Sequence, residues 1–183
     1  VAITMVLILI YIMIRFEIWS GIAAVVALIH DVAMMVFLVI IFRIQVNSAF
    51  IAALITIVSY SINNTIVVFD RVRENQKKEK SIARSTMLDN NSIVNDSIMQ
   101  TLVRSINSTI TTMVAITLFA IIGTASVREF ALPVIFGLLA GFYSSLVIAP
   151  SLYCLMKNTA DKRKAVKNNI KKKDKPKYAG AKN

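Results

Sequence analysis

Residues 20–42, SGIAAVVALIHDVAMMVFLVIIF, form a run of 23 residues in which His30 and Asp31 are the only ionisable side chains. A helix rises about 1.5 Å per residue, so a run of this length crosses the roughly 30 Å hydrocarbon core of a bilayer. The whole chain has the same character, with 56% apolar residues among 183 and a mean hydropathy of +0.66. The sequence therefore predicts an all-α integral membrane protein.

Apolar runs bounded by charged or turn residues predict five membrane spans, at about 1–14, 20–42, 49–69, 104–124 and 130–156. Residues 1–157 then form a transmembrane region with a cytoplasmic connector at 70–103, and the basic residues 158–183 are predicted to be a disordered tail. Within the connector, apolar spacing over 81–100 predicts a weak amphipathic helix at the cytoplasmic surface. The first run is shorter than a span and lacks an initiator Met, so we expect a fragment of a longer protein.

The basic residues lie beside the spans. Of the 21 Lys and Arg, six fall between Arg71 and Arg84 and eleven between Lys157 and Lys182. Since cytoplasmic loops carry an excess of Lys and Arg, we expect a multi-pass protein of a cytoplasmic membrane with its C-terminus inside. We expect the tail to act as a topology anchor beside membrane lipids, and we expect no nucleic-acid partner.

Several classes of chemistry find no support in the sequence. A single cysteine, Cys154, and a single histidine, His30, argue against a disulfide framework and against a metal site built on histidine pairs. There is no Gly-rich phosphate loop, nucleophile elbow or HExxH motif. We therefore expect no enzyme activity, no metal and no cofactor.

Ionisable and amide side chains inside spans are the candidate functional residues. A charge at bilayer depth costs about 2.5–3.5 kcal/mol or more, so each one needs a partner or a function. Asp31 lies near the middle of the second span, and Arg104 opens the fourth. An acid and a base in different spans indicate an ion pathway, whereas the alternative is that Arg104 snorkels to the interface. The supporting polar residues are His30, Tyr60, Asn63, Thr101 and Ser108. Helical spacing predicts one polar face on the third span, formed by Thr56, Tyr60, Asn63 and Asn64, and one on the fourth, formed by Thr101, Arg104, Ser108 and Thr111. In the alternative interpretation the amides and hydroxyls of these faces are interhelical glue.

Small residues recur every four positions in the last span, at Gly137, Gly141 and Ser145. This spacing places them on one helix face, which another helix can approach closely. We interpret this face as helix packing.

The order of several short motifs resembles the SecF family of protein-export membrane subunits. The motifs are Arg15-Phe16-Glu17-Ile18-Trp19, His30-Asp31-Val32, Tyr60-Ser61-Ile62-Asn63, Asp70-Arg71-Val72-Arg73-Glu74-Asn75, Gln100-Thr101-Leu102-Val103-Arg104-Ser105 and Gly141-Phe142-Tyr143-Ser144-Ser145. Together they cover residues 15–145. The resemblance implies a bacterial inner-membrane subunit of the resistance–nodulation–division superfamily, with five helices of its six-span bundle present here and the first span and extracytoplasmic domain missing.

The resemblance also implies partners and a mechanism. Members act with SecD beside the SecYEG channel and use the proton-motive force to move a translocating polypeptide. In the family, the Asn of the Tyr-Ser-x-Asn motif is followed by a proton-carrying aspartate, and an arginine that Arg104 matches accompanies it. Here that position is Asn64, and an amide does not titrate. The ion-coupling candidates are therefore Asp31, Asn64 and Arg104.

Three functions stay open at this point. In the first, the chain is an ion-driven transport subunit that is coupled to protons or to Na⁺. In the second, it is a scaffold, and its partner SecD carries the coupling. A small-molecule permease of the same superfamily is the weakest of the three.

Overall fold

The structure is a computed structural model that describes residues 18–82 and 90–173. Its helices are α2 (Ile18–Ile41), α3 (Ser48–Ile82), α4 (Asn90–Ile122), α5 (Ala125–Tyr143) and α6 (Ala149–Lys173). A π-helical segment, η1 (Ser144–Ile148), joins α5 to α6. No strand occurs in these two ranges, so the all-α prediction is confirmed for the described part of the chain.

Four stretches of helix are long and apolar enough to cross a membrane: Ile18–Ile41, Ser48–Ser81, Asn90–Ile122 and Ala125–Asp161. They contain the predicted spans at 49–69 and 130–156, all but the last residue of 20–42 and all but the last two residues of 104–124. The predicted count of five is not confirmed, because the structure describes four such helices and the predicted span at 1–14 lies outside the described residues.

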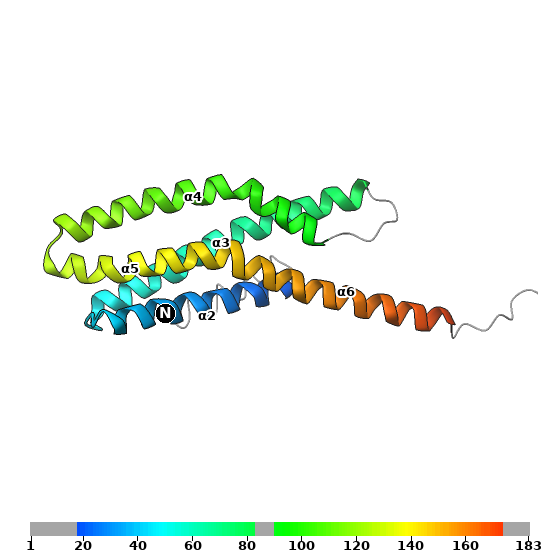
Figure 1. The fold of residues 1–183 in the computed structure, drawn as a ribbon, viewed down its shortest axis with the longest axis horizontal. Helices are drawn as coiled ribbons and strands as arrows, with labels where there is room; N and C mark the ends of the chain where they lie inside the picture. Colours follow the sequence, from blue (N-terminus) through cyan, green and yellow to red (C-terminus); the bar gives the residue numbers. More distant parts are fainter. Residues whose placement is uncertain (1–17, 83–89, 174–183) are drawn as a thin grey trace, which may run out of the picture.

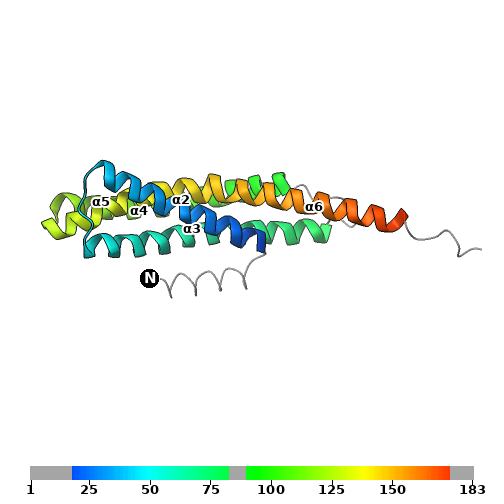
Figure 2. The same ribbon diagram turned by 90° about the horizontal axis from the view of Figure 1, so that it is seen from below.

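The four spans form two helical hairpins that lie side by side (Figures 1 and 2). The α2–α3 turn and the α4–α5 turn lie at the same end of the bundle, and α6 extends beyond the other end. Helix α5 packs against α2, α3 and α4. Helix α4 runs along the edge of the bundle, where only 11% of its most apolar 18-residue window is buried. One side of α4 is therefore left uncovered by the described helices.

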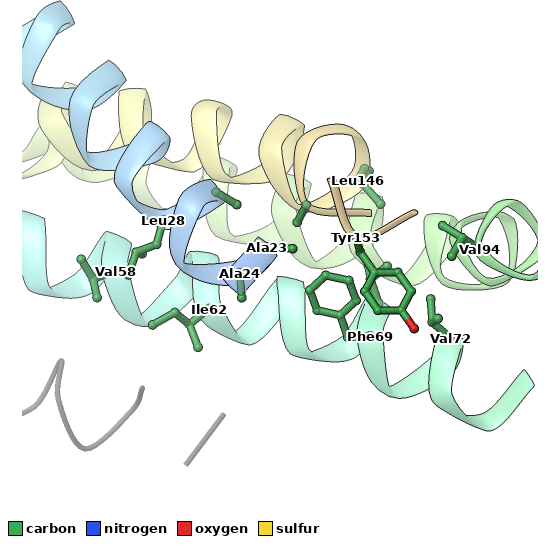
Figure 3. Packing of buried hydrophobic residues seen from close by; sticks show 13 residues of the cluster. Ala23, Ala24, Leu28, Val58, Ile62, Phe69, Val72, Val94, Leu146 and Tyr153 are labelled. Atoms are coloured by element: carbon green, nitrogen blue, oxygen red, sulfur yellow. The ribbon is translucent and has the colours of Figure 1, made fainter. Parts of the chain in front are cut away.

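Two apolar clusters hold the bundle together. In the first, Ala23, Ala24 and Ala27 present small side chains, so α2 can approach its neighbours closely. Figure 3 shows this cluster continuing along α3 to the rings of Phe69 and Tyr153, whose centroids are 5.5 Å apart. The second cluster lies nearer the two turns and centres on the fully buried Met35, Ile57 and Leu138. Because lipid is as apolar as these side chains, close packing is what they contribute to stability.

The predicted connector at 70–103 is helical in its described parts. Helix α3 continues to Ile82 and α4 already begins at Asn90, so both spans extend as continuous helices beyond their apolar parts. Of the stretch 81–100, for which a surface helix is predicted, residues 90–100 are the first three turns of α4, and Ile93 and Val94 are buried in the bundle. Packing of these residues against the bundle keeps the segment in line with the span. Residues 83–89 lie outside the described part.

In the predicted tail, residues 158–173 continue α6 as a helix. Lys, Arg and Ala are good helix formers, and the preceding span supplies the nucleus that a short isolated helix lacks. Asn158 and Asp161 also accept hydrogen bonds from the side chain of Asn90, at 3.0 and 3.1 Å. The remaining residues, 174–183, lie outside the described part.

Candidate functional site

A buried carboxylate lies between α2 and α3 at the middle of the bundle. Asp31 is 0% exposed, and its Oδ2 accepts a hydrogen bond from the hydroxyl of Ser61. Its Oδ1 lies 3.2 Å from Nδ1 of His30, a side chain that is 33% exposed. One oxygen of the carboxylate thus faces the interior, and the other faces a residue at the bundle surface.

Gly141 of α5 closes this site from a third side. A Cβ added to Gly141 would lie 3.7 Å from Asp31 Oδ2 and 3.2 Å from the Cβ of Ser61. We call His30, Asp31, Ser61 and Gly141 the Asp31 cluster. Three of these residues were candidates from the sequence, whereas Ser61 was quoted only as the serine of the Tyr-Ser-x-Asn motif. Ser61 lies one turn before Thr65 on the buried face of α3.

The π-helical segment follows directly after Gly141. Ser144 and Ser145 are 0% and 1% exposed, and their hydroxyls donate to the carbonyls of Gly141 and Phe142 at 3.3 and 3.0 Å. A π turn adds one residue to the helical repeat, and such turns are common at functional sites. Here it interrupts the regular four-residue spacing between Gly141 and Ser145. Gly137, one turn earlier, faces Ile57 of α3.

The amides expected near the site lie in different surroundings. Asn64 is 5% exposed, and its Nδ2 has no hydrogen-bond partner in the described part of the chain. Asn63 is exposed instead. The hydroxyl of Tyr60 donates to Thr109 Oγ1 on α4 at 2.9 Å. These residues therefore do not form the single polar face expected from their spacing.

Helix α4 has two polar rows rather than one. The buried row has a small hydroxyl residue every four positions, at Ser97, Thr101, Ser105 and Thr109. The predicted row mixed both sides, because Thr101 is buried whereas Arg104, Ser108 and Thr111 are exposed. Its spacings of three, four and three residues fit a helical face as well as a four-residue row does, so spacing alone did not separate the two.

The three candidates for ion coupling are not in mutual contact. Asp31 bonds to α3, Asn64 is buried on α3, and Arg104 lies on the uncovered side of α4. Within residues 18–82 and 90–173, no hydrogen bond or ion pair joins Arg104 to either of the others. The carboxylate is thus served by His30 and Ser61, and Arg104 faces away from the bundle.

A second polar layer ties the extensions of α3, α4 and α6 together beyond the apolar spans. Arg71 Nε donates to Gln100 Oε1 at 2.6 Å, and Asn75 Nδ2 donates to the same oxygen and to Ser97 Oγ, both at 2.9 Å. The buried Gln76 donates to the hydroxyl of Tyr153 at 2.8 Å and accepts from Lys157 at 3.4 Å. The predicted motif, whose members are Asp70, Arg71, Arg73, Glu74 and Asn75, lies on this extension of α3.

The carboxyl group of Glu74, on the same extension of α3, has a lowered pKa. Hydrogen bonds from Lys78 and then from Arg71 hold the pKa of its carboxyl below the ordinary value of 4.5. Gln76 and Gln100 complete the layer. The sequence did not identify them as candidates, because glutamine is uncharged and does not contribute to an apolar repeat.

Comparison with known proteins identifies the family. The family described as "Protein export membrane protein SecD/SecF, C-terminal" matches residues 1–159. The chain belongs to the SecD/SecF family. It is 45% identical over 157 residues to the protein translocase subunit SecDF of Bacillus subtilis, covering 86% of this chain and 21% of that protein. It is 38% identical over 156 residues to the protein translocase subunit SecF of Alicyclobacillus acidocaldarius, covering 85% of this chain and 50% of that protein.

A solved structure agrees. The crystal structure of SecDF, a translocon-associated membrane protein from Thermus thermophilus, superimposes with a TM-score of 0.74 at 38% identity, covering 82% of this chain and 20% of that one. The chain therefore spans about half the length of the SecF relative and about a fifth of the SecDF proteins. The SecD/SecF resemblance of the motifs is confirmed, and the chain is a membrane segment of this family.

Proposed function

We propose that this chain is the membrane segment of a subunit of the bacterial Sec export machinery, and that an ion gradient drives its contribution to polypeptide translocation. Family membership supports the export role, since the relatives are named protein translocase subunits. The gradient coupling rests on one observation, the fully buried Asp31 near the middle of a span. A carboxylate in such a place is costly and is kept where it serves a function.

The contacts of Asp31 with α3 and α5 connect a change of its charge to the packing of these helices. Ser61 brings the carboxylate into contact with α3, and Gly141 leaves so little space that α5 packs directly on the pair. Neutralising Asp31 changes the electrostatic cost of keeping these helices together, which is larger at low dielectric than in water. We propose that gain and loss of one positive ion here, H⁺ or Na⁺, shifts the packing of α2 against α3 and α5.

The uncovered side of α4 supports a partner in the membrane. Arg104, Ser108 and Thr111 are exposed on the described bundle, and lipid tolerates such a row poorly. We propose that SecD covers this side and offers acceptors to Arg104, and that the complex acts beside the SecYEG channel. By the distribution of Lys and Arg, the polar layer around Gln76 and the end of α6 lie in the cytoplasm.

A scaffold without coupling is the second candidate, and one observation favours it. Asn64 occupies the position where the family resemblance leads us to expect a titrating aspartate, and its amide lacks a partner in the described bundle. On this hypothesis the polar side chains hold helices together, and SecD carries the coupling.

The export role is tested in cells depleted of the native protein and supplied with variants of it. We expect Asp31→Asn and Arg104→Ala to accumulate unprocessed precursor of an exported protein after pulse labelling. The matched controls are Asp96→Asn and Arg128→Ala. They alter exposed residues near the start of α4 and near the start of α5. Precursor processing at the wild-type rate in both test variants, with normal protein levels, would refute a role for these residues in export.

A further inference from the structure

We infer that His30 is the proton relay of Asp31, carrying protons between the bundle surface and a carboxylate that has no contact with solvent or lipid of its own. This inference rests on the proposed coupling at Asp31 and names the residue that loads it. Its basis is a difference in exposure, since the His30 side chain is 33% exposed and the Asp31 side chain is 0% exposed.

The contact between the two side chains is direct. His30 Nδ1 lies 3.2 Å from Asp31 Oδ1, which is within the range of an N–H···O hydrogen bond. Neighbouring residues on a helix do not normally face each other, so this contact requires the imidazole to turn toward the carboxylate. A histidine ring has two nitrogens, and each of them can donate or accept a proton.

The two oxygens of the Asp31 carboxylate have different neighbours. Oδ2 is occupied by the Ser61 hydroxyl, and Gly141 packs behind both groups. Protons therefore reach the carboxylate through Oδ1, where His30 lies. In the transfer, the imidazolium gives its Nδ1 proton to Oδ1, which leaves a neutral imidazole protonated on Nε2 and a neutral carboxylic acid. The ring then turns its vacant Nδ1 toward the exposed side, takes a proton there from a hydronium ion of water that reaches this side, and turns back.

No competing relay contacts the pair in the described part of the chain. The helices packed on this part of α2 are α3, α5 and α6, together with η1. Within residues 18–82 and 90–173, no hydrogen bond or ion pair joins His30 or Asp31 to a titratable group on these elements, and Tyr60 and Tyr153 bond to Thr109 and Gln76. The buried polar side chains on these elements include Ser61, Asn64, Thr65, Ser144 and Ser145.

The test measures gradient-driven export in vesicles carrying the native protein, as a function of pH on each side. His30→Gln keeps a hydrogen-bonding amide but cannot carry a proton. Because a positioned proton-transfer group contributes about 100-fold or more to the transfer step, we expect the gradient-driven component to fall at least about tenfold and to lose its pH dependence. Export driven by ATP alone should be unchanged. Asp96→Asn, which alters an exposed residue of α4 outside the Asp31 cluster, is the control and should keep the wild-type pH profile.

A second variant distinguishes loss of the proton relay from misfolding. His30→Ala should lose the same component and regain it when imidazole is added, because free imidazole can occupy the vacated space and carry the proton. A structural role predicts the opposite pattern, with His30→Gln active and His30→Ala unaffected by imidazole, and either result would overturn the relay. If Asp31→Asn abolishes the gradient-driven component while His30→Gln keeps it, the relay fails and the coupling stands. If Asp31→Asn has no effect, the coupling itself fails.

Discussion

Gly137 offers the sharpest test of the packing between α3 and α5. A Cβ at this position would lie 2.6 Å from Cγ2 and 2.8 Å from Cδ1 of Ile57, a side chain that is 0% exposed. Carbon atoms in contact prefer about 3.5–4.0 Å, so α5 or Ile57 must move by close to 1 Å. Overpacking of this kind costs about 1–3 kcal/mol, and several clashing atoms on a buried, branched side chain place Gly137→Ala near the upper end.

Helix propensity opposes this cost and sets the net value. Replacing Gly by Ala in a helix interior gains about 1 kcal/mol, which leaves Gly137→Ala destabilising by about 2 kcal/mol, or about 30-fold in the folding equilibrium. Gly141→Ala is the matched comparison, because its nearest contact would be 3.2 Å from Ser61 Cβ. There the small clash and the propensity gain roughly cancel, and we expect stability within about 0.5 kcal/mol of wild type.

The measurement is reversible unfolding in mixed detergent micelles, followed by circular dichroism. The double variant Gly137→Ala, Ile57→Ala removes all the clashing atoms, so it should be less destabilised than the sum of the two single variants. Equal stability of Gly137→Ala and Gly141→Ala, or strict additivity in the double variant, would refute the close approach of α3 and α5 at this level.

Three further predictions concern other parts of the molecule. Tyr153→Phe leaves the buried amide of Gln76 without its hydroxyl acceptor and should lower thermal stability in detergent by about 1–3 kcal/mol, and an unchanged melting temperature would contradict the interhelical contact. The lowered pKa of Glu74 means that its bonds to Lys78 and Arg71 stabilise the end of α3 above the ordinary pKa of 4.5 and are lost as pH falls through the lowered value, so hydrogen-exchange protection there should drop on acidification in wild type but not in Glu74→Gln. Asn64→Asp should be tolerated and should make export in vesicles more sensitive to a proton ionophore, and equal sensitivity would indicate that this position does not join the pathway.

The spans were predictable because bilayer thickness imposes a minimum apolar length. For this reason the predicted span at 49–69 lies within α3, and the predicted span at 20–42 lies within α2 except for its last residue. The ends of the helices were not predictable by the same rule, because beyond the apolar parts the helices are held by specific contacts, such as Asn75 to Ser97 and Asn90 to Asn158. Uncharged polar residues of this kind carry no periodic signal that reveals their partners.

The candidate site was predictable in part. The mid-span position of Asp31 identified it as unusual, and the spacing of Gly137 and Gly141 indicated close packing, but neither reveals that Ser61 faces the carboxylate. On α4 both polar rows fit a helical period, and only the neighbouring helices decide that Thr101 is buried and Arg104 is exposed. The π-helical turn that begins at Ser144 has no signature in the residue pattern.

The central claim, that export through this subunit is coupled to an ion gradient at Asp31, is tested most directly in vesicles with ionophores specific for H⁺ or for Na⁺. The account predicts that one ionophore slows export by the wild-type protein and by the Asp96→Asn control. It predicts that Asp31→Asn exports at the slowed rate whether or not the ionophore is present. Wild-type export that is insensitive to both ionophores, together with full activity of Asp31→Asn, would contradict the account and leave the chain a scaffold.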